Sequence, residues 1–305
     1  MRQNRMIEGI ASTLAGAIAW GMSGTCVQYL FAHSAIDSLL LTALRQVGAG
    51  IMFLAVLLLG HRDQLRKMLA DADSRRRLAI FGTAGLFLNS TLYATTISYT
   101  NAGTATVLQS LNVPMVLGLA CLTERRLPRR LELAALACAA LATFLIATGG
   151  DPNTLHLPLL GLVFGVATAA AAVFYTSYPK PLFERWGSLA TTGVGMAVAG
   201  VSGLAFWTLT RGLSSGFPAL SLDCWAVLGV ASLVGTFGAY SLFLHGISLV
   251  GPVRGNMLGT AEPVSATVLT ALLLHTAFSW ADWAGLVLMV ATIVLVTLQS
   301  SASEG

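Results

Sequence analysis

The stretch PVRGNMLGTAEPVSATVLTALLL, residues 252–274, decides how this chain of 305 residues folds. It has the roughly 20 mostly apolar residues that a membrane-spanning helix needs, yet it carries Glu262 and Pro263 near its middle. A second such stretch, AGTATVLQSLNVPMVLGLACL, residues 102–122, carries Pro114 near its middle, about half a chain length away. The pair predicts an internal repeat with one Pro-interrupted helix in each half.

The composition excludes a soluble domain. Apolar residues make up 55% of the chain and charged residues only 10%, whereas about 25% is usual for soluble proteins. This excludes an ordinary cytosolic enzyme, a disordered chain and a nucleic-acid binder. The chain instead offers ten apolar stretches of membrane-spanning length, at 8–31, 36–59, 78–99, 102–122, 131–148, 158–178, 187–210, 223–246, 252–274 and 281–299.

The basic residues predict the orientation of these helices. If both termini are cytoplasmic, the inside loops are 60–77, 123–130, 179–186 and 247–251. These loops and the tails hold most of the 17 lysines and arginines, whereas the opposite side has only Arg211. Because cytoplasmic loops are enriched in Lys and Arg, we expect both termini to be cytoplasmic.

The chain divides into two repeats of five helices, residues 1–150 and 151–305. Since each half crosses the membrane an odd number of times, the second half runs inverted relative to the first. Inverted repeats with Pro-interrupted helices at corresponding positions indicate a transporter with its site near the middle of the membrane. The expected fold is all-α, with ten transmembrane helices in two inverted repeats around a central cavity.

Several motifs, in this order along the chain, resemble the EamA-like branch of the drug/metabolite transporter superfamily. They are Trp20-Gly21, Arg45, Leu92-Tyr93-Ala94, Pro114 with Glu124, and Glu262-Pro263-Val264. The resemblance implies alternating-access transport of small organic solutes across the bacterial cytoplasmic membrane. It also implies export of amino acids or related metabolites, which is common among EamA-like relatives. The chain departs from the family after the second proline, where Leu274-His275 replaces an acidic motif.

Two charged residues lie deep in predicted helices, where ionisable side chains are costly and usually functional. Glu262 is a candidate substrate ligand and proton acceptor; its structural alternative is to cap backbone groups freed by Pro263 or to pair with Arg45. Arg45 is a candidate partner for a substrate carboxylate; its alternatives are to pair with Glu262 or to extend its charged end to the membrane interface. The sequence leaves open whether both face one cavity.

Polar and aromatic side chains complete the candidate site. The helix at 78–99 has a one-sided polar stripe that includes Asn89, Tyr93 and Thr96, and the helix at 223–246 has a similar stripe that ends at Tyr240. Such stripes face protein or water rather than lipid, so they line a cavity or join helices. The same two interpretations apply to the remaining candidates, Trp20, Gln109, Asn112 and Asn256.

The combined pattern predicts a secondary transporter of amino acids or amino-acid derivatives, with the bilayer, a small-molecule substrate and protons as partners. Cationic or quaternary amines are the alternative substrates. A lipid flippase and a membrane-embedded enzyme are alternatives from other classes, although the sequence has no HExxH or GxSxG motif and no paired carboxylates in one segment. We predict no cofactor and no metal site. The sequence leaves open the direction of transport, the coupling ion and whether the protein is a monomer or a dimer.

Overall fold

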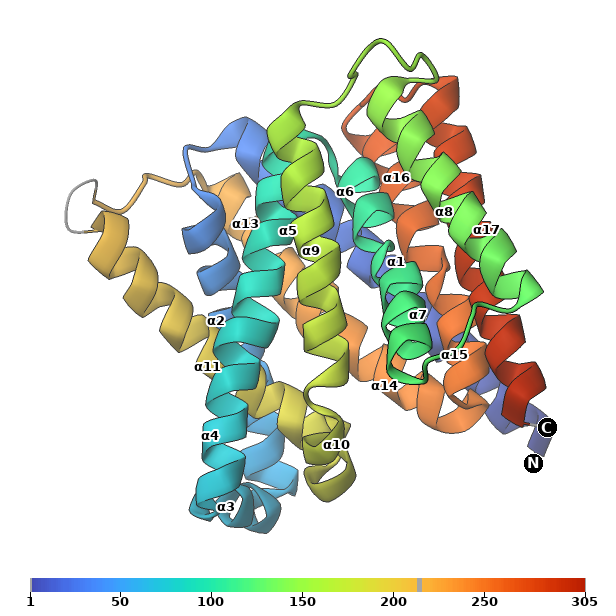
Figure 1. Cartoon of the computed structure of the whole chain (residues 1–305). Helices are drawn as coiled ribbons and strands as arrows, with labels where there is room; N and C mark the ends of the chain where they lie inside the picture. The colour runs from blue at the N-terminus through green and yellow to red at the C-terminus, as the bar shows by residue number, and fades with distance from the viewer. Residues whose placement is uncertain (1, 213–215, 305) are drawn as a thin grey trace.

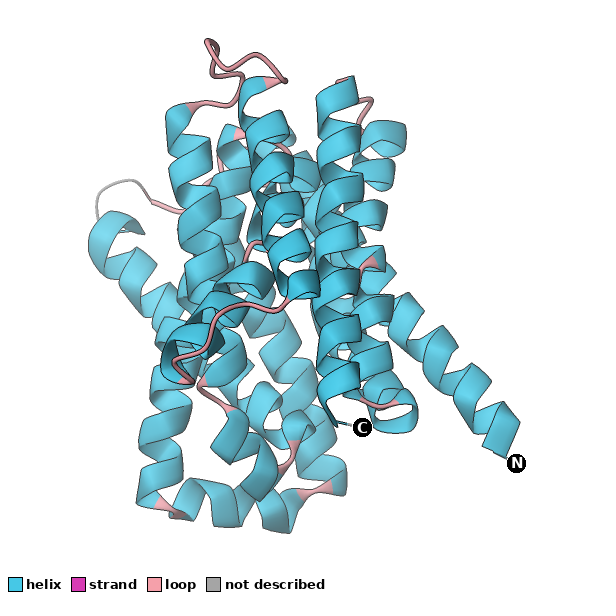
Figure 2. Ribbon diagram, turned by 45° about the vertical axis from the view of Figure 1, so that its right-hand side comes forward, coloured by secondary structure: helices cyan, strands magenta, loops and turns pink. Residues whose placement is uncertain are grey.

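The computed structural model describes residues 2–212 and 216–304, and every regular element in these ranges is helical (Figure 2). The elements of the first half are α1 (Arg2–His33), α2 (Ser38–Gly60), α3 (Arg62–Ala70), α4 (Ala72–Ile80), η1 (Phe81–Phe87), α5 (Leu88–Tyr99), α6 (Ala102–Gln109), α7 (Asn112–Thr123) and α8 (Arg130–Thr148). Those of the second half are α9 (Leu159–Ser177), α10 (Lys180–Trp186), α11 (Ser188–Trp207), η2 (Thr208–Gly212), α13 (Leu222–Ser232), η3 (Leu233–Gly238), α14 (Ala239–Val250), α15 (Pro252–Gly259), α16 (Ala261–Leu273) and α17 (Trp280–Glu304). The η segments are π-helical.

The membrane-spanning helices of the structure agree with the stretches that the sequence predicts. Within the described residues, nine helical stretches are long and apolar enough to cross a membrane, and a shorter apolar helix, Met257–Leu273, lies in the tenth expected position. The two stretches that contain the central prolines are each broken into two helices, α6 with α7 and α15 with α16. The all-helical membrane fold is therefore confirmed.

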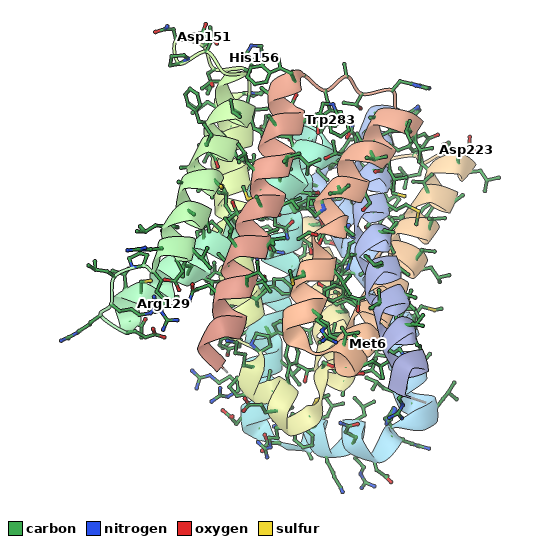
Figure 3. The ribbon with its side chains drawn as sticks, turned by 90° about the vertical axis from the view of Figure 1, so that its right-hand side faces the viewer. Met6, Arg129, Asp151, His156, Asp223 and Trp283 are labelled. Carbon is green, nitrogen blue, oxygen red and sulfur yellow. The ribbon has the colours of Figure 1, made fainter. Side chains whose placement is uncertain are left out.

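The two halves run in opposite directions. Both termini lie at one end of the molecule, which we call the terminus end, and the linker between α8 and α9 lies at the other, the linker end (Figure 1). Asp151, His156 and Trp283 mark the linker end, with Met6 toward the other (Figure 3). Because α1 starts at the terminus end and α9 at the linker end, the second repeat is inverted, as the odd number of crossings predicts.

The segment 60–77, expected as a loop, is helical instead. Leu65 and Met68 on α3 pack into a cluster with Leu57 and Leu182, so α3 has one apolar face despite its arginines. The Asp71 carboxylate caps α4 by accepting a hydrogen bond from the Ser74 amide at 2.9 Å. Hydrogen bonds from Ser74 and Arg185 also hold the pKa of this carboxyl below its usual range. The third membrane-spanning segment therefore begins at the N-terminus of α4, which Asp71 caps.

Asp37 joins the start of α2 to the end of α11. One carboxylate oxygen accepts hydrogen bonds from the Leu39 and Leu40 amides at 2.9 and 3.0 Å. The other accepts a hydrogen bond from the Trp207 indole at 2.8 Å. A helix cap and a contact between the two halves thus depend on one side chain.

We expect Asp37→Ala to lower the free energy of unfolding by about 1–3 kcal/mol, because it removes the cap and the indole bond together. In Asp37→Asn the amide oxygen can still cap α2, but the amide nitrogen cannot accept a hydrogen bond from the Trp207 indole. We therefore expect a smaller loss of stability than for Asp37→Ala. Thermal unfolding in detergent measures both. Equal stability of Asp37→Ala and the parent protein would contradict this role.

Candidate functional site

A small polar cavity lies inside the bundle. Its volume is about 100 Å³. Its walls come from both halves of the chain, and it is called here the central cavity. Its lining residues are Trp20, Ser23, Arg45, Asn89, Ser90, Tyr93, Gln109, Tyr175, Gly235, Thr236, Tyr240 and Glu262.

Most of the residues singled out from the sequence meet in this cavity. They are Trp20, Arg45, Asn89, Tyr93, Gln109, Tyr240 and Glu262. The structure therefore places the deep base, Arg45, and the deep acid, Glu262, on one cavity, which the sequence left open. The polar stripes of the third and eighth membrane-spanning segments, one from each half, both contribute side chains to the wall of this cavity.

Arg45 is held in the cavity wall without a carboxylate. Its side chain is 8% exposed, and Nη1 donates a hydrogen bond to the Ser23 hydroxyl at 3.1 Å. Its Nε is buried and has no hydrogen-bond partner within the described part of the chain. No ion pair in that part of the chain joins Arg45 to Glu262. Burying a guanidinium without a counter-charge is costly, so the cavity suits an anionic group.

Close contact between helices sets the position of Glu262. A Cβ atom added to Gly21 of α1 would lie 2.8 Å from the Glu262 carbonyl oxygen. Only a glycine lets α1 approach α16 this closely. Glu262 itself lies in the first turn of α16, two residues after the helix break at Thr260. The break and the glycine together bring the acid to the cavity wall.

Aromatic rings form much of the remaining wall. The Tyr93 hydroxyl hydrogen bonds with the Thr106 hydroxyl at 2.7 Å, and the Tyr240 hydroxyl donates to that of Tyr175 at 3.4 Å. The Trp20 ring packs edge-on against Tyr240, with 4.9 Å between the ring centroids. Rings held in this way can pack against an apolar group or a cation.

Sequence reasoning missed four lining residues, Ser23, Ser90, Tyr175 and Gly235. Ser23 lies one turn after Trp20, so extending that face of α1 would have identified it. Ser90 is next to Asn89 but is not part of the expected stripe. Tyr175 lies in an apolar stretch with no regular polar spacing, and only the packing of α9 against the bundle shows where it points.

Two of the candidates, Thr96 and Asn112, lie elsewhere. The Thr96 hydroxyl hydrogen bonds with the Thr168 hydroxyl at 3.2 Å, so it joins α5 to α9 as a helix–helix contact. Asn112 lines a second, larger space. The side chain of Asn256 lies outside the described residues.

The larger space, called here the vestibule, has a volume of about 850 Å³. It also borders Glu262, so one residue lines both spaces. Near its rim, Arg126 forms ion pairs with Glu124 at 2.5 Å and with Glu132 of α8 at 2.7 Å. Arg126 belongs to the α7–α8 loop, which projects from the bundle beside Arg129 (Figure 3). The remaining lining residues lie in α7, in the loops before α7 and α8, and in helices of the second half. They are Ser110, Asn112, Val113, Val116, Leu117, Ala120, Arg129, Thr176, Phe243, Gly259, Pro263, Ile293, Val296, Thr297 and Gln299.

Two inverted helical repeats around a polar cavity, with a wider vestibule leading from it, define a membrane transporter. The model of the EamA-like transporter family matches residues 7–148 and 159–298, so the chain belongs to this family. The two matched ranges correspond to the two repeats.

Known proteins of similar sequence are also transporters by name. An uncharacterized inner membrane transporter of Salmonella typhimurium, YicL, is 32% identical over 96% of both chains. An uncharacterized transporter of Bacillus subtilis, YwfM, is 22% identical over 93% of this chain and 92% of its own. A solved crystal structure, described only as that of a protein, has a TM-score of 0.63 over the whole of both chains at 19% identity, which supports the fold.

Proposed function

We propose that the protein carries a small zwitterion, an amino acid or an amino-acid derivative, across the bacterial inner membrane by alternating access, with Glu262 as the proton-coupling group. The observation that carries this proposal is the presence of Arg45 and Glu262 on one cavity with no ion pair between them in the described residues. One anionic and one cationic group of the same ligand can pair with both.

The chemistry of the wall suits each end of a zwitterion. The buried Nε of Arg45 has no hydrogen-bond partner among the residues that the structure describes, and a guanidinium binds a carboxylate through two parallel hydrogen bonds. Glu262 attracts an ammonium group, and the buried Asn89 Oδ1, also without a partner in the described residues, can accept a hydrogen bond from it. In this arrangement, Trp20, Tyr93 and Tyr240 would surround the carbon atoms of the ligand.

The size of the central cavity limits the ligand. A closed cavity of about 150 Å³ accommodates benzene, a molecule of six carbon atoms. At about 100 Å³, the central cavity has room for a small amino acid but not for a large aromatic one in this conformation. A lipid is far too large for it, which disfavours the flippase alternative.

The vestibule supports alternating access and proton coupling. Its lining runs from residues of the α7–α8 loop to Glu262, so this residue borders both the central cavity and the larger space. A group in that position can exchange a proton with one side of the membrane while it also faces the ligand.

A cationic or quaternary amine is the second candidate substrate. Four aromatic residues, Trp20, Tyr93, Tyr175 and Tyr240, line the same cavity as Glu262, and such a site binds organic cations by cation–π attraction.

Counterflow of a panel of amino acids and amines by purified protein in liposomes tests the proposal. Counterflow of a soluble amino acid supports it, and lipid movement or substrate turnover without such counterflow overturns it.

The role of Arg45 separates the two substrates. A hydrogen bond to a charged group contributes about 1.5–3 kcal/mol, so for a zwitterion Arg45→Ala should weaken amino-acid binding by about 10- to 100-fold. Amine binding should change much less. Equilibrium binding to purified protein measures both, with Arg76→Ala, a change to an exposed arginine, as the control. If only amines bind, and Arg45→Ala leaves their affinity unchanged, the zwitterion proposal fails.

The role of Glu262 appears in the pH dependence of transport. If Glu262 exchanges a proton during the cycle, Glu262→Gln should abolish the pH dependence of flux while the protein stays folded. Glu124→Gln is the matched control, because Glu124 also borders the vestibule but lies near its rim. It should keep the pH profile of the parent protein. A lower thermal stability of Glu262→Gln, with residual flux that keeps its pH profile, would instead assign Glu262 a structural role.

We also propose that the terminus end is cytoplasmic, because the arginine-rich segments lie on that side. In a variant without its native cysteines, Thr154→Cys in the linker should react with an impermeant thiol reagent added to intact cells. Ala70→Cys at the end of α3 should react only after the membrane is opened. The reverse labelling pattern would contradict this orientation.

A further inference from the structure

At the linker end of the bundle, one side chain forms hydrogen bonds with both halves of the chain. The Gln28 amide of α1 donates from Nε2 to the Thr276 hydroxyl at 3.0 Å. Its Oε1 accepts a hydrogen bond from the Ala102 amide at 2.8 Å. Ala102 begins α6 in the first half, and Thr276 follows α16 in the second. Gln28 thus ties α1 to both broken helices.

A second layer of contacts lies beneath this side chain. The buried hydroxyls of Thr25 and Thr270 share a hydrogen bond of 3.1 Å between α1 and α16. A Cβ atom added to Gly103 of α6 would lie 2.8 Å from the Thr267 hydroxyl of α16. The three helices therefore pack closely between the linker end and the central cavity.

The opposite halves of the same broken helices are separated. Asn112 of α7 and Gly259 of α15 both line the vestibule, a space of about 850 Å³. The structure is thus closed where α6 meets α16 and open where α7 faces α15. An alternating-access cycle must reverse this difference, and the contacts at the linker end must then break.

We propose that Gln28 is a gating residue whose side chain holds the linker end of the pathway closed. This inference rests on the alternating-access function proposed above. The amide is suited to the role because it donates to one half and accepts from the other. The Ala102 amide at a helix start has no partner within its own helix, so Gln28 satisfies it in the closed state and water can do so in the open state. Such an exchange of partners costs little free energy, which keeps the gate reversible.

Two introduced thiols report the state of the gate without any substrate. In a background without Cys26, Cys121, Cys138 and Cys224, Thr267→Cys lies beneath the gate and Asn112→Cys lies in the vestibule. Impermeant thiol reagents are applied to each side of proteoliposomes. Gln28→Leu should raise labelling at position 267 from the linker side by about fivefold or more, the effect of losing one or two hydrogen bonds, and lower labelling at position 112.

Thr276→Val tests the same gate by changing the residue of the second half that accepts a hydrogen bond from Gln28. It removes one of the two Gln28 bonds, so we expect a smaller rise at position 267, and no further rise when it is combined with Gln28→Leu. Gln64→Leu is the matched control, because Gln64 donates to the Trp186 carbonyl at 2.5 Å, far from the gate in the α3–α10 contact. It should leave both labelling rates unchanged.

The outcomes separate the gate from the transport mechanism. If position 267 is labelled from the linker side in the parent, and neither Gln28→Leu nor Thr276→Val changes the rate, the pathway opens there but Gln28 is not its gate. If position 267 is never labelled from that side in any variant, the linker end does not open. Alternating access, and the function proposed from it, is then overturned.

Discussion

The bilayer requires every backbone polar group to find a partner within the protein, and this constraint places the functional site. A helix can be interrupted inside a membrane only where the freed groups face protein or a polar cavity. The part of the chain that the structure describes has two such interruptions, between α6 and α7 and between α15 and α16, each just before a proline. Because the repeats are inverted, both breaks lie at the core of the bundle. The central cavity lies between them, with Gln109 before one break and Glu262 after the other.

The same constraint explains why the two charged residues deep in the membrane, Arg45 and Glu262, indicate what kind of ligand binds. A buried guanidinium and carboxylate are most stable when they pair with each other, yet no ion pair joins Arg45 to Glu262 in the described residues. Arg45 instead donates to the neutral Ser23 hydroxyl, which compensates little of its charge. Charges kept apart in a cavity lower the stability of the protein alone, and a ligand that carries both opposite charges can compensate them. This is why the arrangement favours a zwitterion.

The sequence predicts the membrane-spanning pattern well because length and hydropathy report directly on lipid contact. It also identifies Arg45 and Glu262, since any charge at that depth is costly. It fails where the question is which neighbour a polar side chain faces. Tyr93 and Thr96 belong to one stripe, yet Tyr93 lines the cavity and Thr96 bonds to α9. Tyr175 was missed for the same reason, because its orientation depends on how α9 packs rather than on its own spacing.

The first helix connects the site to the gate. Trp20 and Ser23 of α1 line the central cavity, and Gln28 lies only five residues beyond Ser23 on the same continuous helix. α1 packs against α16 and α6 at the linker end, so it cannot shift there without moving the cavity wall. In both halves a π-helical segment, η1 or η3, lies just before the tyrosine that faces this wall, Tyr93 or Tyr240. Such segments are frequent at functional sites because they interrupt the regular helix. The continuous helix α1 therefore connects the cavity wall to the gate, and the two π-helical segments adjoin the spans that carry the tyrosines of that wall.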